Sequence, residues 1–304
     1  MSRIAFLGTP GAAVPTLQTL VENHDVAVVI TQPDRPRGRS GSPSPPPVKV
    51  EALRLGLTVE QPGSADELGR ALAEVGSLDL AVVVAYGRLL RPETLAVPLH
   101  GMLNVHFSLL PRWRGAAPVA RALLAGDPMT GVTLIELDEG LDTGPVLTAQ
   151  AIDIEPYETA GELTTRLAHL GARLIGDALP AYLGGQLAPV PQSDEGMTYA
   201  AKIEPSDRPL HVEGPSLEAV NRVRALSPEP GATLAIDEER IQVLDARPSE
   251  FSPGTGLWAG HIGNLVAGFG DGGVELTEIK PPGRNPMTGA AWLRGRNREN
   301  GKLS

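Results

Sequence analysis

The sequence contains no cysteine and few aromatic residues. Phe, Trp and Tyr together make up 4% of its 304 residues. The lack of cysteine excludes disulfides, thiolate metal sites and cysteine nucleophiles. No apolar run approaches the ~20 residues that a membrane-spanning helix needs, and Met1–Gly8 leads straight into a strand pattern without signal-peptide architecture. We therefore expect a cytoplasmic protein with no membrane partner.

Positive charge is also in short supply. The chain has 26 basic and 36 acidic residues, a net charge of −10, which argues against a general polyanion binder. The distribution is uneven, because Arg284, Arg294, Arg296, Arg298 and Lys302 are opposed after position 280 only by Glu299. A nucleic-acid partner would have to use local basic patches of this kind.

Length and periodicity predict two domains. A chain of 304 residues exceeds the size at which single cores usually split. Its first half alternates apolar strand-like runs with helix-like segments, the pattern of a doubly wound α/β parallel sheet with helices on both faces. The expected strands are 4–8, 26–31, 79–85, 102–106, 132–137 and 146–152, and the expected helices are 12–22, 48–55, 66–75, 117–124 and 159–182.

The pattern dissolves into Gly, Pro, Asp and Ser after residue 183. We place a catalytic domain at 1–189, a linker at 190–207 and a smaller domain at 208–304. In the last part we expect a helix at 217–225. Short apolar segments at 240–244, 261–267 and 273–279, separated by Gly and Pro turns, then suggest a small β-barrel.

An amide, an imidazole and a carboxylate form the most informative constellation. Asn104 and His106 are two residues apart on an expected strand and so point to one face. Their N–H groups would suit a developing oxyanion, and Asp142, after the next strand, would orient the imidazole and favour its charged form. Taken alone, Asn-x-His is more often a pair of polar strand-end residues, and Asp-Thr-Gly an ordinary turn.

Several longer motifs strengthen the functional interpretation. They are Gly8-Thr-Pro10, Thr31-Gln-Pro-Asp34, Val84-Ala-Tyr86-Gly87, Asn104-Val-His106, Ser108-Leu-Leu-Pro111-Arg-Trp-Arg-Gly-Ala-Ala-Pro118 and Leu141-Asp142-Thr-Gly144. On these residues the chain resembles the methionyl-tRNA formyltransferases of the 10-formyltetrahydrofolate-dependent formyltransferase family. The resemblance runs through nearly the whole chain.

The resemblance implies a Rossmann-like catalytic domain and a C-terminal OB-like barrel that binds tRNA. It implies transfer of a formyl group from 10-formyltetrahydrofolate, the donor cosubstrate, to the α-amine of initiator Met-tRNA. Asn104 and protonated His106 would stabilise the oxyanion, and Asp142 would relay the proton that the amine loses. We expect a monomer without a metal.

The resemblance also implies where the folate binds. The loop around Tyr86–Leu90 and the loop around Leu137–Leu141 would enclose the pterin, mainly through backbone groups. Either segment taken alone also fits an ordinary surface loop. The expected folate-binding residues are Tyr86, Gly87, Arg88, Leu89, Leu90, Ser108, Leu109, Leu110, Pro111, Leu137, Asp138 and Leu141.

Basic residues are candidates for tRNA binding. Relatives carry a basic loop that wedges against the acceptor stem, but here Ser-Gly-Ser replaces the usual Lys-Lys. In the run Arg112-Trp113-Arg114 we weigh equally a nucleic-acid site and a Trp packed on the sheet between solvated arginines. The expected tRNA-binding residues are Arg35, Arg37, Arg39, Arg112, Arg114, Arg294, Arg296 and Arg298. Phe107, where many relatives have Gly, would narrow the crevice beside His106.

Three other functions are weaker. A formyltransferase for a sugar nucleotide or purine precursor shares the Asn-His-Asp set, but the basic loop and tail argue against it. An inactive folate- or RNA-binding module conflicts with an intact Asn104, His106 and Asp142. A nicotinamide oxidoreductase needs Gly-x-Gly-x-x-Gly after the first strand, and position 10 is Pro.

Overall fold

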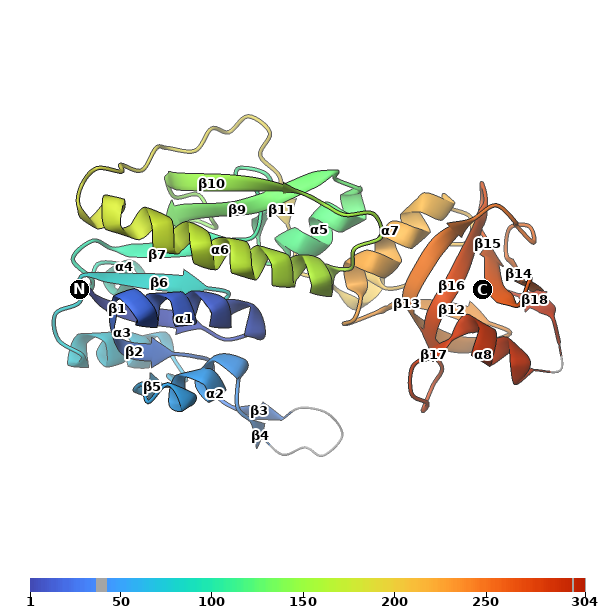
Figure 1. Ribbon diagram of the computed structural model, residues 1–304, viewed down its shortest axis with the longest axis horizontal. Coiled ribbons are helices and arrows are strands. Elements are labelled where there is room, and N and C mark those ends of the chain that lie inside the picture. The colour runs from blue at the N-terminus through green and yellow to red at the C-terminus, as the bar shows by residue number, and fades with distance from the viewer. Residues whose placement is uncertain (37–42, 297, 304) are drawn as a thin grey trace. The chain divides into compact units, whose positions relative to one another are not determined.

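The computed structural model describes residues 1–36, 43–296 and 298–303. The chain divides into two compact units (Figure 1). Unit 1 comprises 1–118, 130–152 and 164–200, and unit 2 comprises 119–129, 153–163 and 201–304. Within the described part of the chain, no helix combines the length and the apolar character that spanning a membrane requires.

Unit 1 is built on a seven-stranded sheet with the strand order β10-β9-β7-β6-β1-β2-β5. Its strands are β1 (Arg3–Gly8), β2 (Asp25–Ile30), β5 (Val59–Glu60), β6 (Leu80–Val84), β7 (Met102–His106), β9 (Met129–Glu136) and β10 (Val146–Asp153). The pairs from β5 to β7 are parallel, whereas β7 and β9 are antiparallel. The sheet is therefore Rossmann-like but mixed, with the reversed strand beside the one that carries Asn104.

Helices cover both faces of this sheet. They are α1 (Val14–Asn23), α2 (Pro47–Arg54), α3 (Ala65–Glu74), α4 (Pro92–Leu95), α5 (Pro118–Ala125, shared with unit 2) and α6 (Ala160–Leu183), with a 3-10 turn η1 (Gly11–Ala13). On one face, Leu68 and Leu72 of α3 pack against Ala5 and Leu7 of β1. On the other, Gly171 lets the α6 backbone approach the side chains of β7 and β9 closely.

Local capping explains where α3 and α6 begin. Ser64 caps α3 by accepting a hydrogen bond from Glu67 N, and the acidic first turn suits the helix dipole. Thr159 and Glu162 form a reciprocal pair of side-chain-to-backbone bonds before α6. Such a capping box satisfies two helix-end donors at once.

Short paired segments border the site. β3 (Arg35–Pro36) pairs with β4 (Pro43–Ser44), and β8 (Arg114–Gly115) pairs in parallel with β11 (Tyr199–Ala200). β11 lies in the segment that the sequence suggested was a linker.

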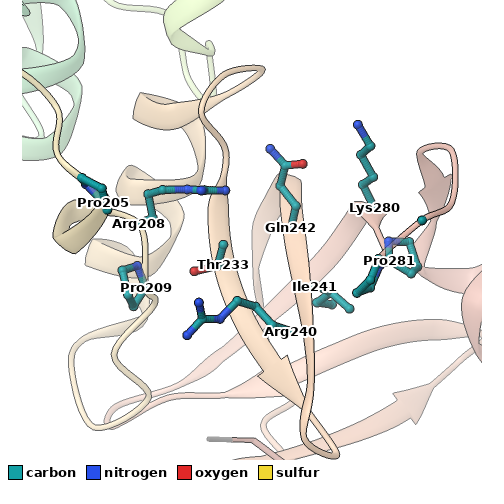
Figure 2. A pocket seen from close by; sticks show the side chains of 11 residues that line it. Pro205, Arg208, Pro209, Thr233, Arg240, Ile241, Gln242, Lys280 and Pro281 are labelled. Carbon is teal, nitrogen blue, oxygen red and sulfur yellow. The ribbon is translucent and has the colours of Figure 1, made fainter. Parts of the chain in front are cut away.

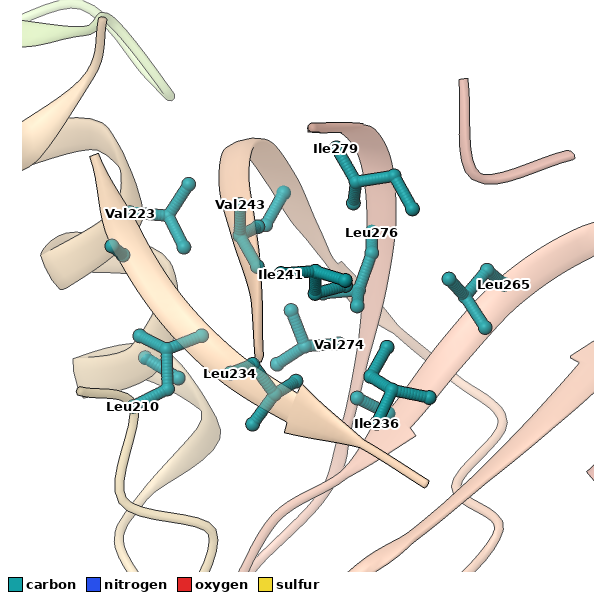
Figure 3. Packing of buried hydrophobic residues seen from close by; sticks show 14 of the residues in the cluster. Leu210, Val223, Leu234, Ile236, Ile241, Val243, Leu265, Val274, Leu276 and Ile279 are labelled. Carbon is teal, nitrogen blue, oxygen red and sulfur yellow. The ribbon is translucent and has the colours of Figure 1, made fainter. Parts of the chain in front are cut away.

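Unit 2 is an antiparallel sheet with the order β12-β13-β16-β15-β14-β18, to which β17 adds beside β16. Its elements are η2 (Pro205–Asp207), α7 (Ser216–Leu226), β12 (Ala232–Ile236), β13 (Glu239–Ser249), β14 (Leu257–His261), β15 (Asn264–Gly268), β16 (Gly273–Lys280), β17 (Met287–Thr288), α8 (Gly289–Arg294) and β18 (Asn300–Lys302). Figure 3 shows apolar side chains from β12, β13, β15 and β16 gathered in its core, with Val223 of α7 beside them. This architecture matches the expected OB-like barrel.

One predicted strand of unit 2 was wrong. The segment 261–267 is not continuous but spans the end of β14, a turn and the start of β15. Ile262 and Gly263 both have positive φ, 49° and 81°, and so form the tight hairpin connection. Apolar Ile262 masked the turn in the sequence.

Candidate active site

Three polar side chains meet at the end of β7. Asn104 Nδ2 donates to Asp142 Oδ1 at 3.3 Å, and His106 Nδ1 lies 3.6 Å from Asp142 Oδ2. Met102, Asn104 and His106 lie on one face of β7, because alternate strand residues point the same way. Met102 packs in the core that includes α3, so Asn104 and His106 lie on the α3 side of the strand. The structure thus brings the amide, the imidazole and the carboxylate into one place.

The loop that carries Asp142 is held by hydrogen bonds. Gly115 N donates to Asp142 Oδ2 at 2.8 Å, and Gln192 Nε2 donates to the carbonyls of Asp142 and Gly144 at 2.9 and 2.7 Å. Asp142 has φ 53°, a left-handed conformation that Asp tolerates better than most residues. The carboxylate is therefore fixed in position before any substrate binds.

The geometry around His106 determines what its two ring nitrogens can do. Nε2 lies 2.9 Å from Trp113 O, and since a carbonyl can only accept, Nε2 carries a hydrogen. At 3.6 Å, Nδ1 is beyond hydrogen-bond range of the carboxylate but close enough to feel its charge. Nδ1 therefore remains available to a substrate atom.

Gly115→Ala is expected to lower kcat by roughly 10- to 100-fold. Gly115 has φ 118°, and an added Cβ would lie 2.9 Å from Ala200 O, so the backbone must shift. The shift would remove the N–H bond to the Asp142 carboxylate, and bonds to charged groups contribute about 1.5–3 kcal/mol. Steady-state kinetics and the thermal midpoint would measure the effect.

Gly76→Ala is the matched control. Gly76 also has positive φ, 86°, but an added Cβ would meet nothing within 4 Å. It should lose some stability and keep wild-type kcat. A folded Gly115→Ala enzyme with wild-type kcat would show that the Gly115 N–H does not support catalysis.

The loop after His106 is tied to β9. Ser108 Oγ donates to Arg112 O, Thr133 Oγ1 donates to Ser108 O, and Leu110 N donates to Thr133 Oγ1, at 2.7, 2.7 and 3.1 Å. Leu109 packs beside Gly131. In the predicted folate segment Ser108–Pro111, the Ser108 hydroxyl and the Leu109 side chain thus hold the loop itself together.

Phe107 does not narrow the crevice, contrary to the expectation. Its side chain is buried, 9% exposed, and its ring packs near Gly171 of α6. Val105 lies beside the same glycine. Since neighbouring strand residues point to opposite faces, Phe107 is directed away from the face of Asn104 and His106.

The loop after β6 presents backbone more than side chains. The Tyr86 side chain is 2% exposed and packs in the α3-side core, where burial raises the pKa of its phenol. Its hydroxyl has no hydrogen-bond partner among the described residues. Its carbonyl accepts from Thr9 Oγ1 and Gln32 Nε2 at 3.2 and 3.3 Å. Tyr86 therefore shapes the loop from beneath, and Gly87 with φ 82° makes the turn.

Arg88 faces the neighbouring strand end. Its Nε donates to Gln32 Oε1 and its Nη1 to Pro62 O, both at 3.0 Å. The side chain thus joins the loop after β6 to the ends of β2 and β5. Leu90 packs against the core, whereas Leu89 is 76% exposed and remains available for contact.

The second predicted folate loop is internally braced. Asp138 accepts hydrogen bonds from Gly140 N and from Thr143 Oγ1, at 3.0 and 2.8 Å. Leu137 packs on the same core as Leu90, and Leu141 is exposed beside Gly115. Each of the two loops therefore contributes one exposed leucine, an apolar surface suited to a flat aromatic ring.

A buried arginine corrects one tRNA assignment. Arg114 is only 4% exposed, its Nε donates to Gln192 Oε1 at 2.9 Å, and its Nη1 lies 3.0 Å from Met197 Sδ. It holds the segment that carries Gln192 and is not presented to a nucleic acid. The alternative in which both arginines face solvent was also wrong for Arg114. Arg112 stacks over the Trp113 ring at 4.4 Å.

The other predicted tRNA contacts differ in availability. Arg35, Arg294 and Arg298 are exposed. Arg296 is not free, because it pairs with Glu239 at 2.5 Å and stacks on Trp292 at 3.9 Å. Its assignment to tRNA is corrected accordingly. Arg37 and Arg39 lie outside the described residues.

Sequence reasoning missed the residues that support the catalytic side chains. Gln192 follows the last helix of unit 1 in a Gly- and Pro-rich stretch with no periodicity, so nothing in the sequence indicated it. Gln32 stood within the motif Thr31-Gln-Pro-Asp34, which was noted only as part of the resemblance. Backbone groups such as Trp113 O and Gly115 N have no sequence signal at all.

Comparison with known proteins adds family information. Residues 2–179 match the family described as formyl transferase, and residues 202–297 match the formyl transferase C-terminal domain. A methionyl-tRNA formyltransferase of Halorhodospira halophila is 50% identical over 97% of this chain and 96% of its own length. One from Roseobacter denitrificans is 44% identical over 99% and 98%.

Solved structures share the fold at low identity. An N-formyltransferase from Helicobacter canadensis, in complex with folinic acid and dTDP-3-aminofucose, has a TM-score of 0.71 at 18% identity, covering 92% of this chain and all of its own. HypX from Aquifex aeolicus, in complex with tetrahydrofolic acid, has a TM-score of 0.68 at 20% identity, covering 96% of this chain. The chain spans 47% of HypX.

Proposed function

We propose that this chain, which belongs to the formyl transferase family, transfers the formyl group of 10-formyltetrahydrofolate to the α-amino group of methionyl initiator tRNA. The reaction serves translation initiation. The observation that carries the proposal is the meeting of Asn104, His106 and Asp142 at the end of β7.

The chemistry follows from the donors and acceptors at this site. When the amine attacks the formyl carbon, negative charge develops on the formyl oxygen. Collapse of this tetrahedral intermediate breaks the bond between the formyl carbon and the folate nitrogen and releases tetrahydrofolate. One N–H of Asn104 is held by Asp142, and the amide has a second to offer. Together with His106 Nδ1–H it would stabilise the oxyanion, and each such donor contributes about 3–4 kcal/mol in a preorganised site.

Asp142 has two roles in this scheme. Its carboxylate holds the Asn104 amide and lies 3.6 Å from His106 Nδ1. It would also accept the proton that the attacking amine loses, through an intervening water. The bond from Gly115 N keeps Oδ2 oriented for both roles.

The residues present fit a folate. The loops 86–90 and 137–141 offer exposed backbone and the two leucines 89 and 141. We propose that the pterin lies between them and contacts mainly backbone, so that single side-chain changes there matter less than changes at Asn104 or His106. Among the described residues, no group of three or more His, Asp or Glu is placed to hold a metal.

Met-tRNA is favoured over a sugar or purine-precursor amine as acceptor. The methionyl-tRNA formyltransferases of Halorhodospira halophila and Roseobacter denitrificans are 50% and 44% identical over nearly the whole chain, whereas the sugar-nucleotide-bound structure is 18% identical and supports the fold alone. A location in the cytoplasm remains our prediction and suits relatives named methionyl-tRNA formyltransferase. A monomeric state remains a prediction as well.

The deciding experiment offers the enzyme labelled 10-formyltetrahydrofolate and a choice of acceptors. Charged initiator Met-tRNA should be formylated, and free amino sugars and glycinamide-type amines should not. Formylation of the small amines alone would overturn the tRNA proposal while leaving formyl transfer intact. Absence of transfer to every acceptor would overturn both.

A further inference from the structure

Two residues beside the catalytic side chains have a left-handed backbone, although neither is glycine. Asp142 has φ 53° and Trp113 has φ 65°. Such conformations are disfavoured for residues with a Cβ, and more strongly for a bulky Trp than for Asp. They persist where the surrounding structure fixes them. The contacts that hold these two backbones therefore determine where Asp142 and the partner of His106 lie.

A glutamine from a distant part of the chain holds the first of these backbones. Gln192 Nε2 donates to the carbonyl oxygens of Asp142 and Gly144, at 2.9 and 2.7 Å. Both hydrogens of the amide nitrogen are thereby used. The two acceptors lie on either side of Thr143, so a single side chain fixes the whole turn that presents the Asp142 carboxylate.

A buried arginine determines which way this glutamine faces. Arg114 is 4% exposed, and its Nε donates to Gln192 Oε1 at 2.9 Å. If the amide turned over, its oxygen would face two carbonyl oxygens and its NH2 group would face the guanidinium, so neither end would have a suitable partner. Arg114 therefore acts on Asp142 through Gln192.

A threonine six residues after Gln192 holds the second backbone. Trp113 N donates to Thr198 Oγ1 at 2.9 Å, and Trp113 O lies 2.9 Å from His106 Nε2. Arg114 N also donates to Thr198 O at 2.9 Å. Because Thr198 fixes the peptide groups on both sides of Trp113, it also fixes the direction in which the Trp113 carbonyl meets the imidazole.

We infer that Gln192 and Thr198 are positioning residues for the formyl transfer, Gln192 through Asp142 and Thr198 through His106. The inference rests on the proposed function, because it concerns the same reaction at the same site. Small displacements matter there, since a shift of about 1 Å in a reacting group can lower a rate by about 10²-fold. The segment after α6 thus supplies a separate support for each of the two catalytic groups.

Two substitutions test the role of the glutamine. Gln192→Met removes both donors at similar side-chain length, whereas Gln192→Glu keeps an oxygen for Arg114 but turns an acceptor toward the two carbonyls. Each should lower kcat by about tenfold, the effect of leaving buried polar groups without a partner. KM for Met-tRNA should stay at the wild-type value. Wild-type kcat in Gln192→Glu would show that the donated hydrogen bonds do not position Asp142.

A second pair of substitutions tests the threonine. Thr198→Val keeps nearly the same shape but offers no acceptor to Trp113 N, and it should lower kcat by about tenfold. Thr198→Ser keeps the hydroxyl and should turn over at close to the wild-type rate. If the serine variant loses as much activity as the valine variant, the hydroxyl is not the group that positions His106.

Matched controls come from unit 2. Gln242 also donates from Nε2 to a backbone carbonyl, that of Pro230, at 2.8 Å. Gln242 and Thr233 line a groove of this unit, where Figure 2 shows their side chains. Gln242→Met and Thr233→Val make the same chemical changes and should keep wild-type kcat. Losses in these controls equal to those in Gln192→Met and Thr198→Val would assign the effect to general destabilisation and overturn the inference.

Combination with the catalytic variants separates positioning from damage to the whole site. If Gln192 acts through the Asp142 carboxylate, Gln192→Met should have almost no further effect on kcat in an Asp142→Ala enzyme. Thr198→Val should likewise have almost no further effect in a His106→Ala enzyme, because coupled residues are not additive. The same loss in these backgrounds as in the wild-type enzyme would contradict the inference.

Failure of this inference differs from failure of the proposed function. If the wild-type enzyme formylates Met-tRNA and the Gln192 and Thr198 variants do so equally fast, only the positioning roles fall. If the wild-type enzyme transfers the formyl group to no acceptor, the proposed function falls and the positioning roles fall with it.

Discussion

Replacing His106 or Asn104 by alanine should lower kcat by about 10²–10³-fold each, which is the usual effect of removing one oxyanion donor. Both side chains lie at the end of β7, and their N–H groups converge beside Asp142. KM for either substrate should change little, because the lost interaction forms only as charge develops on the formyl oxygen. Single-turnover kinetics with labelled formyl donor would measure the chemical step.

The fold should survive both changes. Neither variant removes an apolar core residue, so the thermal midpoint should remain close to that of the wild type. The double variant provides a second criterion, since donors that act on one oxyanion are non-additive. A double variant whose loss equals the product of the single losses would argue that the two groups act on different atoms.

Asp142→Ala should lower kcat by about 10²–10⁴-fold, the range of acid–base contributions. The change removes the acceptor for the amine proton, the partner of His106 and the partner of Asn104 at once. Asp142→Asn separates these losses, because an asparagine keeps much of the shape but neither the charge nor the basicity. Its kcat should therefore also fall.

Asp194→Asn is the matched control for the carboxylate. Asp194 lies in the same unit, its side chain is 93% exposed, and it is 4.0 Å from Arg114 at its nearest. This variant should keep wild-type turnover. Near-full turnover in Asp142→Ala would remove the acid–base role from the mechanism.

The regular elements of unit 1 could be predicted because their apolar periodicity is strong. β7 begins and ends at Met102 and His106, where the sequence pattern placed it, and alternation on that strand sufficed to pair Asn104 with His106. The direction of β9 relative to β7 could not be predicted, because the same apolar run is compatible with a parallel or an antiparallel pairing.

In unit 2 the sequence signal is weaker. β12 (ATLAI) is short and interrupted by small residues, and α8 has only six residues, so neither stood out.

Charge alone also misled the interpretation of the site. Arg114 and Arg112 are adjacent to Trp113 in sequence, and both looked like candidates for a nucleic acid. Arg114 instead donates to the side-chain oxygen of Gln192 in a buried position, where a residue without a donor would leave that oxygen unpaired. Burial of this kind depends on residues far away in the chain and could not be read from the local pattern.

The segment that follows the long helix sets a lower limit on any shortened catalytic protein. Gln192, Thr198 and Ala200 bind the backbone around Asp142, Trp113 and Ala116. A fragment cut at residue 189, where composition suggested the catalytic domain ends, would lose all three anchors. Truncation designed to isolate the formyl-transfer chemistry must therefore retain the chain through Ala200.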